Sequence, residues 1–61
     1  MKYLLTRKGW DGKDYVTPEG DLWSDLCEGC EFDSKEEAEE MMHKMQETET
    51  DAYAQYFIEK I

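Results

Sequence analysis

The sequence predicts an α+β domain in which one amphipathic helix packs on one face of a small antiparallel sheet, in the order β-β-β-α-β. Three observations predict it: a hairpin pattern near the amino terminus, one capped helix with an apolar stripe, and a strand-like carboxyl-terminal segment. The 61 residues allow a single domain over 1–61. Because a chain of this length hides only about 60% of its unfolded surface, we expect marginal stability.

Residues 2–8 and 13–17 are predicted to form an antiparallel hairpin. Strand-favouring residues fill both segments, and the intervening residues 9–12, Gly-Trp-Asp-Gly, are a strong turn signal. Asp11-Gly12 suits a type I′ turn, whose two central residues need positive φ. A second turn is expected at residues 18–21. Which face of the hairpin is buried stays open, because Leu4 and Leu5 point to opposite sides.

The middle of the chain gives a weaker pattern. Residues 22–26 carry Leu22, Trp23 and Leu26, a spacing that fits one helical turn as well as a bent strand. Residues 30–32 are predicted to form a short third strand, because a helix begins directly after them.

The helix is the clearest element of the sequence. Ser34 and Glu37 have the spacing of a capping box, in which each side chain bonds an unpaired backbone amide. An apolar stripe at i, i+3, i+4 and i+7 follows and predicts a face that fills the core more readily than an adaptable binding groove. Its members are Ala38, Met41, Met42 and Met45. Glu40 and Lys44 are placed for an i,i+4 ion pair on the outer face.

The carboxyl-terminal segment is predicted to complete the sheet. Residues 48–51 favour a loop, and residues 53–61 are rich in aromatic and β-branched side chains. A strand there would help to cover the Met stripe. A second helix beginning at Asp51, with Ala52, Tyr53 and Tyr56 on one face, is the alternative.

The net charge of −9 is unevenly distributed along the chain. Residues 1–13 carry four bases against one acid, whereas residues 14–51 carry fourteen acids against two lysines. Such a field repels nucleic acid and membrane surfaces and attracts basic partners. We call ten of these acids the acidic belt: Glu19, Asp21, Asp25, Glu28, Glu31, Asp33, Glu36, Glu37, Glu39 and Glu40.

Length and hydropathy narrow the functional classes. A domain this small can barely fill its own centre, which argues against an enzyme and gives no reason to expect a cofactor. No apolar run approaches the roughly 18 residues of a membrane span, and the apolar run at the amino terminus is too short for a signal peptide. We therefore expect a cytoplasmic protein that binds another macromolecule.

Two cysteines and a histidine form the one candidate metal site. Cys27 and Cys30 are a C-x-x-C pair, twelve residues separate Cys30 from His43, and Glu47 occupies the position of a fourth ligand. A metal-stapled module is thus an alternative interpretation. The favoured one is that both cysteines are reduced, with Cys30 in the core and Cys27 in a loop. Neighbouring carboxylates would raise the thiol pKa values, which argues against redox catalysis.

Two segments carry a resemblance to a known group of proteins. They follow the predicted hairpin: residues 23–26 are Trp-Ser-Asp-Leu, and residues 32–38, which open the helix, are Phe-Asp-Ser-Lys-Glu-Glu-Ala. This order of hairpin, Trp segment and helix start resembles small accessory proteins of bacteriophages and prophages. The resemblance spans about two thirds of the domain and implies a β-β-β-α-β layer. It also implies a host-directed binding role, which includes inhibitors of host defence of the anti-CRISPR type.

The expected function is that of an acidic protein that binds and inhibits or modulates a basic host protein. The belt is either a solvated face or a contact surface, and spaced carboxylates could mimic a nucleic-acid backbone. Trp10 at the hairpin tip is either an exposed contact residue or packs across the strands. A homodimer through the carboxyl-terminal segment or a strand edge is also expected. The predicted binding residues are Trp10, Glu28, Glu31, Glu36, Glu39 and Glu40.

Overall fold

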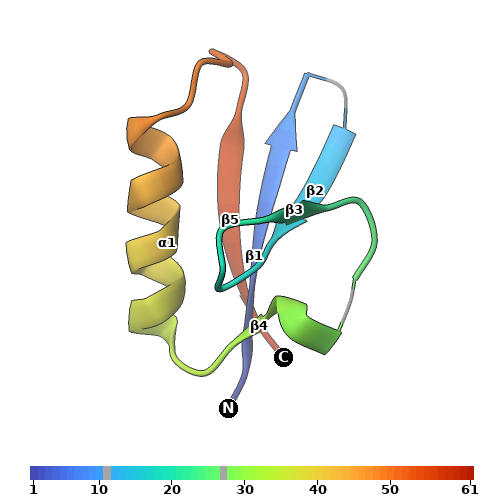
Figure 1. Ribbon diagram of the computed structural model, residues 1–61, viewed down its shortest axis with the longest axis vertical. Helices are drawn as coiled ribbons and strands as arrows, with labels where there is room; N and C mark the ends of the chain where they lie inside the picture. Colours follow the sequence, from blue (N-terminus) through green and yellow to red (C-terminus); the bar gives the residue numbers. More distant parts are fainter. Residues whose placement is uncertain (11, 27) are drawn as a thin grey trace.

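The computed structural model describes residues 1–10, 12–26 and 28–61, with the backbone alone described at Glu28. Five strands are present among these residues: β1 (Tyr3–Gly9), β2 (Gly12–Val16), β3 (Leu22–Trp23), β4 (Glu31–Phe32) and β5 (Gln55–Lys60). A 3-10 turn, η1 (Glu28–Cys30), precedes β4, and the helix α1 (Lys35–Glu47) lies between β4 and β5 (Figure 1). The predicted α+β class with one helix is confirmed, with one more short strand than expected.

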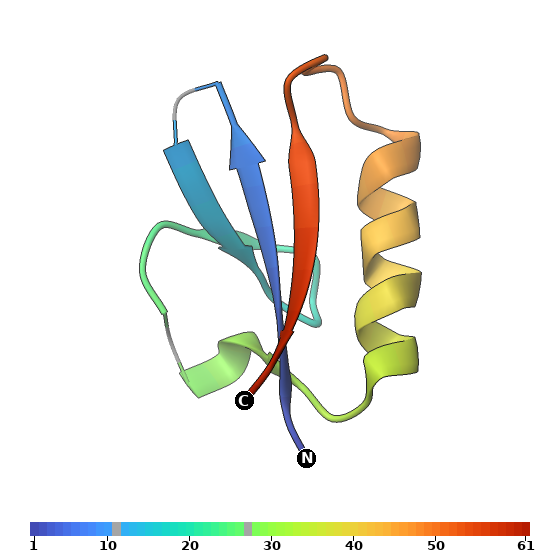
Figure 2. The same ribbon diagram turned by 180° about the vertical axis from the view of Figure 1, so that it is seen from behind.

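Strand β1 is the centre of an antiparallel sheet. β5 pairs with residues 3–8 along one side of β1. On the other side, β4 pairs with residues 3–4 and β2 with residues 5–9. β3 adds to β2. Figures 1 and 2 show β1 between β5 and β2, with α1 running beside β5. Residues 22–23 are thus a strand. The alternative of a second helix beginning at Asp51 is wrong, because Gln55–Lys60 form β5.

The hairpin turn differs from the predicted type I′ turn at Asp11-Gly12. Gly9 pairs with Gly12, so the residues between the strands are Trp10 and Asp11, of which Asp11 lies outside the described residues. Gly12 begins β2 with φ +137°, a conformation that glycine adopts without strain, whereas Trp10 does not have positive φ. The prediction failed because this register places Leu5 against Val16, and pairing of core residues outweighs the local turn preference.

The core lies between the sheet and α1. Leu5, Val16, Phe32 and Ala38 form one buried cluster, so it is the Leu5 face of the hairpin that the helix covers. The methionines of the predicted stripe pack against this cluster while remaining partly exposed, together with aromatic and β-branched side chains of β1 and β5. The stripe therefore fills the core, as predicted.

Helix α1 follows the predicted cap residue, with one of the two bonds of the predicted capping box. The return bond, from the Ser34 backbone N–H to the Glu37 carboxylate, is not formed among the described residues. The Ser34 hydroxyl accepts a hydrogen bond from the Glu37 backbone N–H at 3.2 Å, which satisfies one unpaired amide of the first turn. The expected Glu40–Lys44 pair is not formed among the described residues. Lys35 and Glu39 approach to 4.0 Å instead. This is also an i,i+4 pair, but it lies at the start of the helix and the base precedes the acid.

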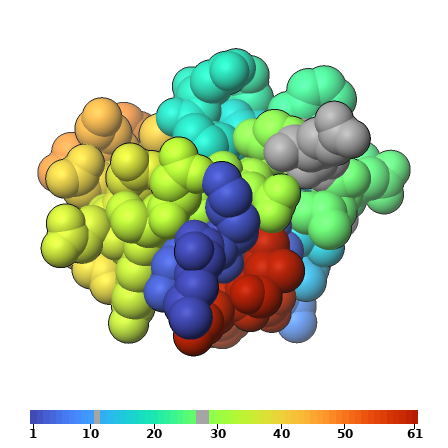
Figure 3. Space-filling model, turned by 90° about the horizontal axis from the view of Figure 1, so that it is seen from below, coloured from blue at the N-terminus to red at the C-terminus, as the bar shows by residue number. Residues whose placement is uncertain are grey.

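The two chain ends meet beside the start of α1. The Ile61 backbone N–H donates to the Lys2 carbonyl oxygen at 2.9 Å, and Lys2 forms an ion pair with Asp33. Figure 3 shows the amino- and carboxyl-terminal residues side by side at this end of the molecule. The described part of the chain has no helix with the length and hydropathy needed to cross a membrane.

Candidate functional site

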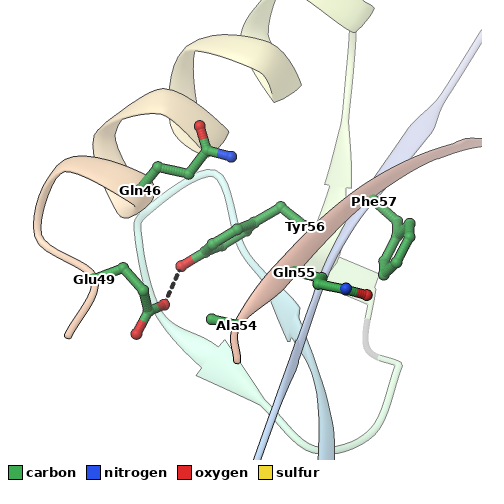
Figure 4. A pocket seen from close by; sticks show the side chains of 6 residues that line it. All are labelled: Gln46, Glu49, Ala54, Gln55, Tyr56 and Phe57. Carbon is green, nitrogen blue, oxygen red and sulfur yellow. Dashed lines mark hydrogen bonds between the residues drawn. The ribbon is translucent and has the colours of Figure 1, made fainter. Parts of the chain in front are cut away.

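A largely buried ion pair fixes the loop after α1 to the sheet. The Arg7 guanidinium of β1 binds both oxygens of the Glu49 carboxylate, with Nε–Oε1 2.6 Å and Nη2–Oε2 2.8 Å. The Tyr56 hydroxyl of β5 donates to the same Oε1 at 2.5 Å (Figure 4). The Arg7 and Glu49 side chains are only 14% and 16% exposed. A bidentate, charge-assisted pair of this kind has a fixed geometry, so the loop position is tightly defined.

Asp51 links this ion pair to the hairpin tip. Its Oδ2 accepts the Trp10 backbone N–H at 3.0 Å, and its Oδ1 accepts the Tyr53 backbone N–H at 2.8 Å. Gly9 leaves the space for this approach, because an added Cβ would lie 2.9 Å from Arg7 Nη1 and 3.1 Å from Asp51 Oδ2. One carboxylate thus holds two backbones that are far apart in the sequence.

The consequence is an exposed aromatic pair at the hairpin tip. The Trp10 and Tyr53 ring centroids are 6.1 Å apart with an interplanar angle of 43°, and the two residues are 81% and 72% exposed. Trp10 therefore does not pack across the hairpin, which was one of the two expectations. Tyr53 was not predicted as a site residue, since it follows Trp10 by more than forty residues and no local pattern joins them.

Hydrogen bonding shifts the proton affinities of the acids at the tip. Bonds from Arg7, and then from Tyr56, hold the pKa of Glu49 well below its usual range. The Tyr53 and Trp10 backbone N–H groups lower the pKa of Asp51. Burial, and then the bond to Glu49, raises the pKa of Tyr56. Glu49 and Asp51 are therefore charged, and Tyr56 neutral, at neutral pH, which is the combination that this network requires.

Acid should weaken the domain through Glu49. Its folded pKa is lowered, so its stabilising contribution is complete above the unfolded value, about 4.3, and is lost as pH falls toward the folded value. We expect Glu49→Gln to be less stable than wild type at pH 7 and to lose less stability between about pH 5 and pH 2.5. Urea unfolding across this range measures both. Glu47→Gln, on an exposed residue of α1, is the matched control, and parallel pH curves for wild type and Glu49→Gln would contradict the prediction.

The acidic belt is centred on the amino-terminal half of α1. Glu36 and Glu40 are exposed on its outer face, and Glu39 and Glu31 are partly buried. The side chain of Glu28 lies outside what the structure describes. A hollow of about 170 Å³ between Pro18, Glu37 and Glu40 places the turn after β2 beside the helix, which brings more belt acids to the same region. Of the described belt residues, Asp33 and Glu39 have basic partners, Lys2 and Lys35.

The predicted binding residues do not share one surface. Trp10 belongs to the hairpin tip between β1 and β2, and Glu36, Glu39 and Glu40 belong to the amino-terminal half of α1; Figure 1 shows these two parts at opposite ends of the molecule. Glu31 pairs with Leu4, which places its side chain on the sheet face turned away from α1. A small ligand could not contact all of these surfaces, so only a macromolecular partner could use all of the predicted residues.

The cysteine predictions are only partly correct. Cys30 is fully buried, as expected, but it is disulfide-bonded rather than reduced. The prediction for Cys27 lies outside the described residues. The prediction of a reduced thiol followed from the expected cytoplasmic location, where cysteines are mostly reduced. His43 is exposed on α1, and the described residues contain no group of three His, Cys, Asp or Glu side chains placed to hold a metal ion.

Comparisons of the chain with protein-family models, with curated proteins and with solved structures found no match.

Proposed function

We propose that this domain binds a basic host protein through the acidic belt and thereby inhibits or modulates it. The observation that carries the proposal is the exposed carboxylates on the outer face of α1, with Glu36 and Glu40 at its centre. Neither of these two carboxylates has a basic partner within 4.0 Å among the described residues. Unneutralised charge on a rigid helix is suited to steering and orienting an oppositely charged protein.

The rigidity of α1 supports a binding role over a merely solvating one. The helix is capped by Ser34 and fixed by its apolar stripe on the core, so the backbone positions that carry its outer glutamates keep a constant spacing. A preorganised surface loses little conformational entropy on association. Inhibition of a host factor, and a phage origin, are proposed from the sequence resemblance. Nucleic-acid mimicry is the form of this proposal in which the partner's own ligand is DNA or RNA.

Affinity capture from a host-cell lysate tests the proposal. The immobilised domain should retain a basic protein, identified by mass spectrometry, and 0.5 M NaCl should release it because salt screens exposed charges. Glu36→Gln should reduce capture about threefold or more, as expected for one contact charge at an interface. If the partner binds nucleic acid, added duplex DNA should compete with the domain.

Glu47→Gln provides the matched control. It makes the same charge change on the same exposed side of α1, three helical turns from Glu36, or roughly 16 Å along the axis. Capture should be nearly unchanged. Retention that is equally strong in both variants and unaffected by salt would show that the belt is a solvated face.

A further inference from the structure

The sheet face turned away from α1 carries a row of aromatic side chains. Side chains alternate along a strand, so Thr6 lies on the face opposite the buried Leu5, and residues paired across strands share a face. Figure 4 shows the same alternation in β5, where Tyr56 points toward Glu49 and Phe57 points away. The aromatic row, defined by strand pairing, consists of Phe57, Thr6, Tyr15 and Trp23. Phe57 is 46% and Trp23 51% exposed.

Charges of opposite sign lie on the two sides of this row. The basic row lies two residues from the aromatic row toward the hairpin tip and is formed by Gln55, Lys8 and Lys13. The acidic row lies two residues from the aromatic row in the opposite direction and is formed by Glu59, Leu4 and Glu31. A hollow of about 250 Å³ is lined by residues of all three rows, which confirms that they share one face: Thr6, Lys8, Lys13, Phe57 and Glu59.

The basic row is unfavourable in the isolated domain. Lys8 and Lys13 pair directly across β1 and β2, and like charges in that position destabilise a sheet. Neither ammonium has a carboxylate within 4.0 Å among the described residues. Lys13 instead lies 5.4 Å from the centroid of the Tyr15 ring. A partner that supplies carboxylates opposite these lysines would remove the repulsion.

We propose that a second copy of this chain packs face to face on this surface as a symmetric dimer. A two-fold axis along the aromatic row sets the aromatic rows of the two copies against each other. The same rotation reverses the strand direction, so the basic row of each copy meets the acidic row of the other. Such a contact is self-complementary, as a two-fold interface requires.

The fold gives a second reason for this occupant. Domains usually bury a sheet between layers, but here a single helix covers one face. A face-to-face dimer adds the missing layer as a sandwich of two sheets. The molecule is small, with extents of 31 × 22 × 18 Å, so one sheet face offers only a small interface. We expect a dimer of micromolar rather than nanomolar affinity.

A single-stranded nucleic acid is the main competing occupant, since exposed aromatics and lysines can bind bases and phosphates. The acidic row on the same face and the net charge of −9 oppose it. In the dimer the acidic row meets the basic row of the second copy, whereas it would repel a polyanion. Charge complementarity therefore favours a second copy.

Sedimentation analysis of charge-reversal variants tests the dimer at about 5 to 500 µM protein in 0.15 M NaCl. Wild type should dimerise, while Lys8→Glu and Glu59→Lys should each raise the dimer Kd at least about tenfold, because each places like charges across the axis. The double variant should recover most of the affinity, since it restores opposite charges between the copies. Phe57→Ser should also weaken the dimer about tenfold or more.

Lys44→Glu and Glu47→Lys make the same charge changes on α1 and should leave the dimer Kd unchanged. A wild-type monomer over the whole range would overturn the proposal. So would a dimer insensitive to Lys8→Glu, Glu59→Lys and Phe57→Ser, which would indicate pairing through a strand edge. Binding of a fluorescent oligothymidylate by wild type that Lys8→Glu abolishes would assign the face to single-stranded nucleic acid instead.

Discussion

Replacing Phe32 with alanine is expected to leave much of the domain unfolded at 25 °C. Phe32 is 2% exposed and packs in the small core cluster with Leu5, Val16 and Ala38. Truncation of a buried phenylalanine costs about 3 to 5 kcal/mol. A domain of this length has a total stability of roughly 3 to 9 kcal/mol. The variant should therefore show a much lower urea midpoint, or no folded baseline, by far-UV circular dichroism.

Phe57→Ala is the matched control for this experiment. It removes the same atoms from a phenylalanine that is 46% exposed on the face away from α1. At about 1 µM protein, below the expected dimer range, it should cost about 1 kcal/mol or less, because it leaves no closed cavity. Equal destabilisation by the two variants would show that the core is not where the structure places it.

Replacing Arg7 with methionine is expected to release the loop between α1 and β5. Methionine keeps much of the apolar stem but leaves the Glu49 carboxylate, 16% exposed, without its bidentate partner. Loss of a hydrogen-bonded charge partner at a covered site is among the larger single-residue effects. Hydrogen exchange measured by NMR should show the amides of residues 51–56 exchanging about tenfold faster or more, while those of α1 keep most of their protection.

The same release should separate the exposed aromatic pair. Asp51 positions Trp10 and Tyr53, and Arg7 Nη2 lies 3.9 Å from Asp51 Oδ2, so the pair depends on the ion pair beneath it. Nuclear Overhauser contacts between the Trp10 and Tyr53 rings should be lost in Arg7→Met. Lys44→Met, which removes an exposed cation from α1, should retain them. Retained ring contacts and unchanged exchange in Arg7→Met would contradict this account of the tip.

The sequence predicts the parts of the fold that local physics determines. Ser34, Glu37 and the apolar stripe define α1 within fourteen residues, and the exposure of Glu36 and Glu40 follows from the same helical period. β1, β2 and β5 were predictable from strand-favouring residues between turn signals. The turn at the hairpin tip was not, because its position depends on the pairing of Leu5 with Val16 rather than on Asp11-Gly12.

The network at the tip could not be predicted from local patterns. Arg7 and Glu49 are 42 residues apart, and their contact depends on how α1 returns the chain to the sheet. One signal was present: Arg7 shares a strand face with Leu5, the face that α1 covers, and a covered arginine needs a carboxylate partner. The three rows on the sheet face turned away from α1 follow from the registers of the four pairings that join the five strands, which strand prediction alone does not provide.

The salt dependence of affinity for the captured partner shows whether the acidic belt makes the contact. Isothermal titration of that protein with wild type, Glu36→Gln and Glu47→Gln, from about 0.05 to 0.5 M NaCl, gives a slope of log Kd against log salt for each. We predict steep weakening for wild type, a shallower slope and weaker low-salt binding for Glu36→Gln, and wild-type behaviour for Glu47→Gln. Affinity that is constant across this range and identical in all three proteins would contradict the proposal that the acidic belt binds the partner.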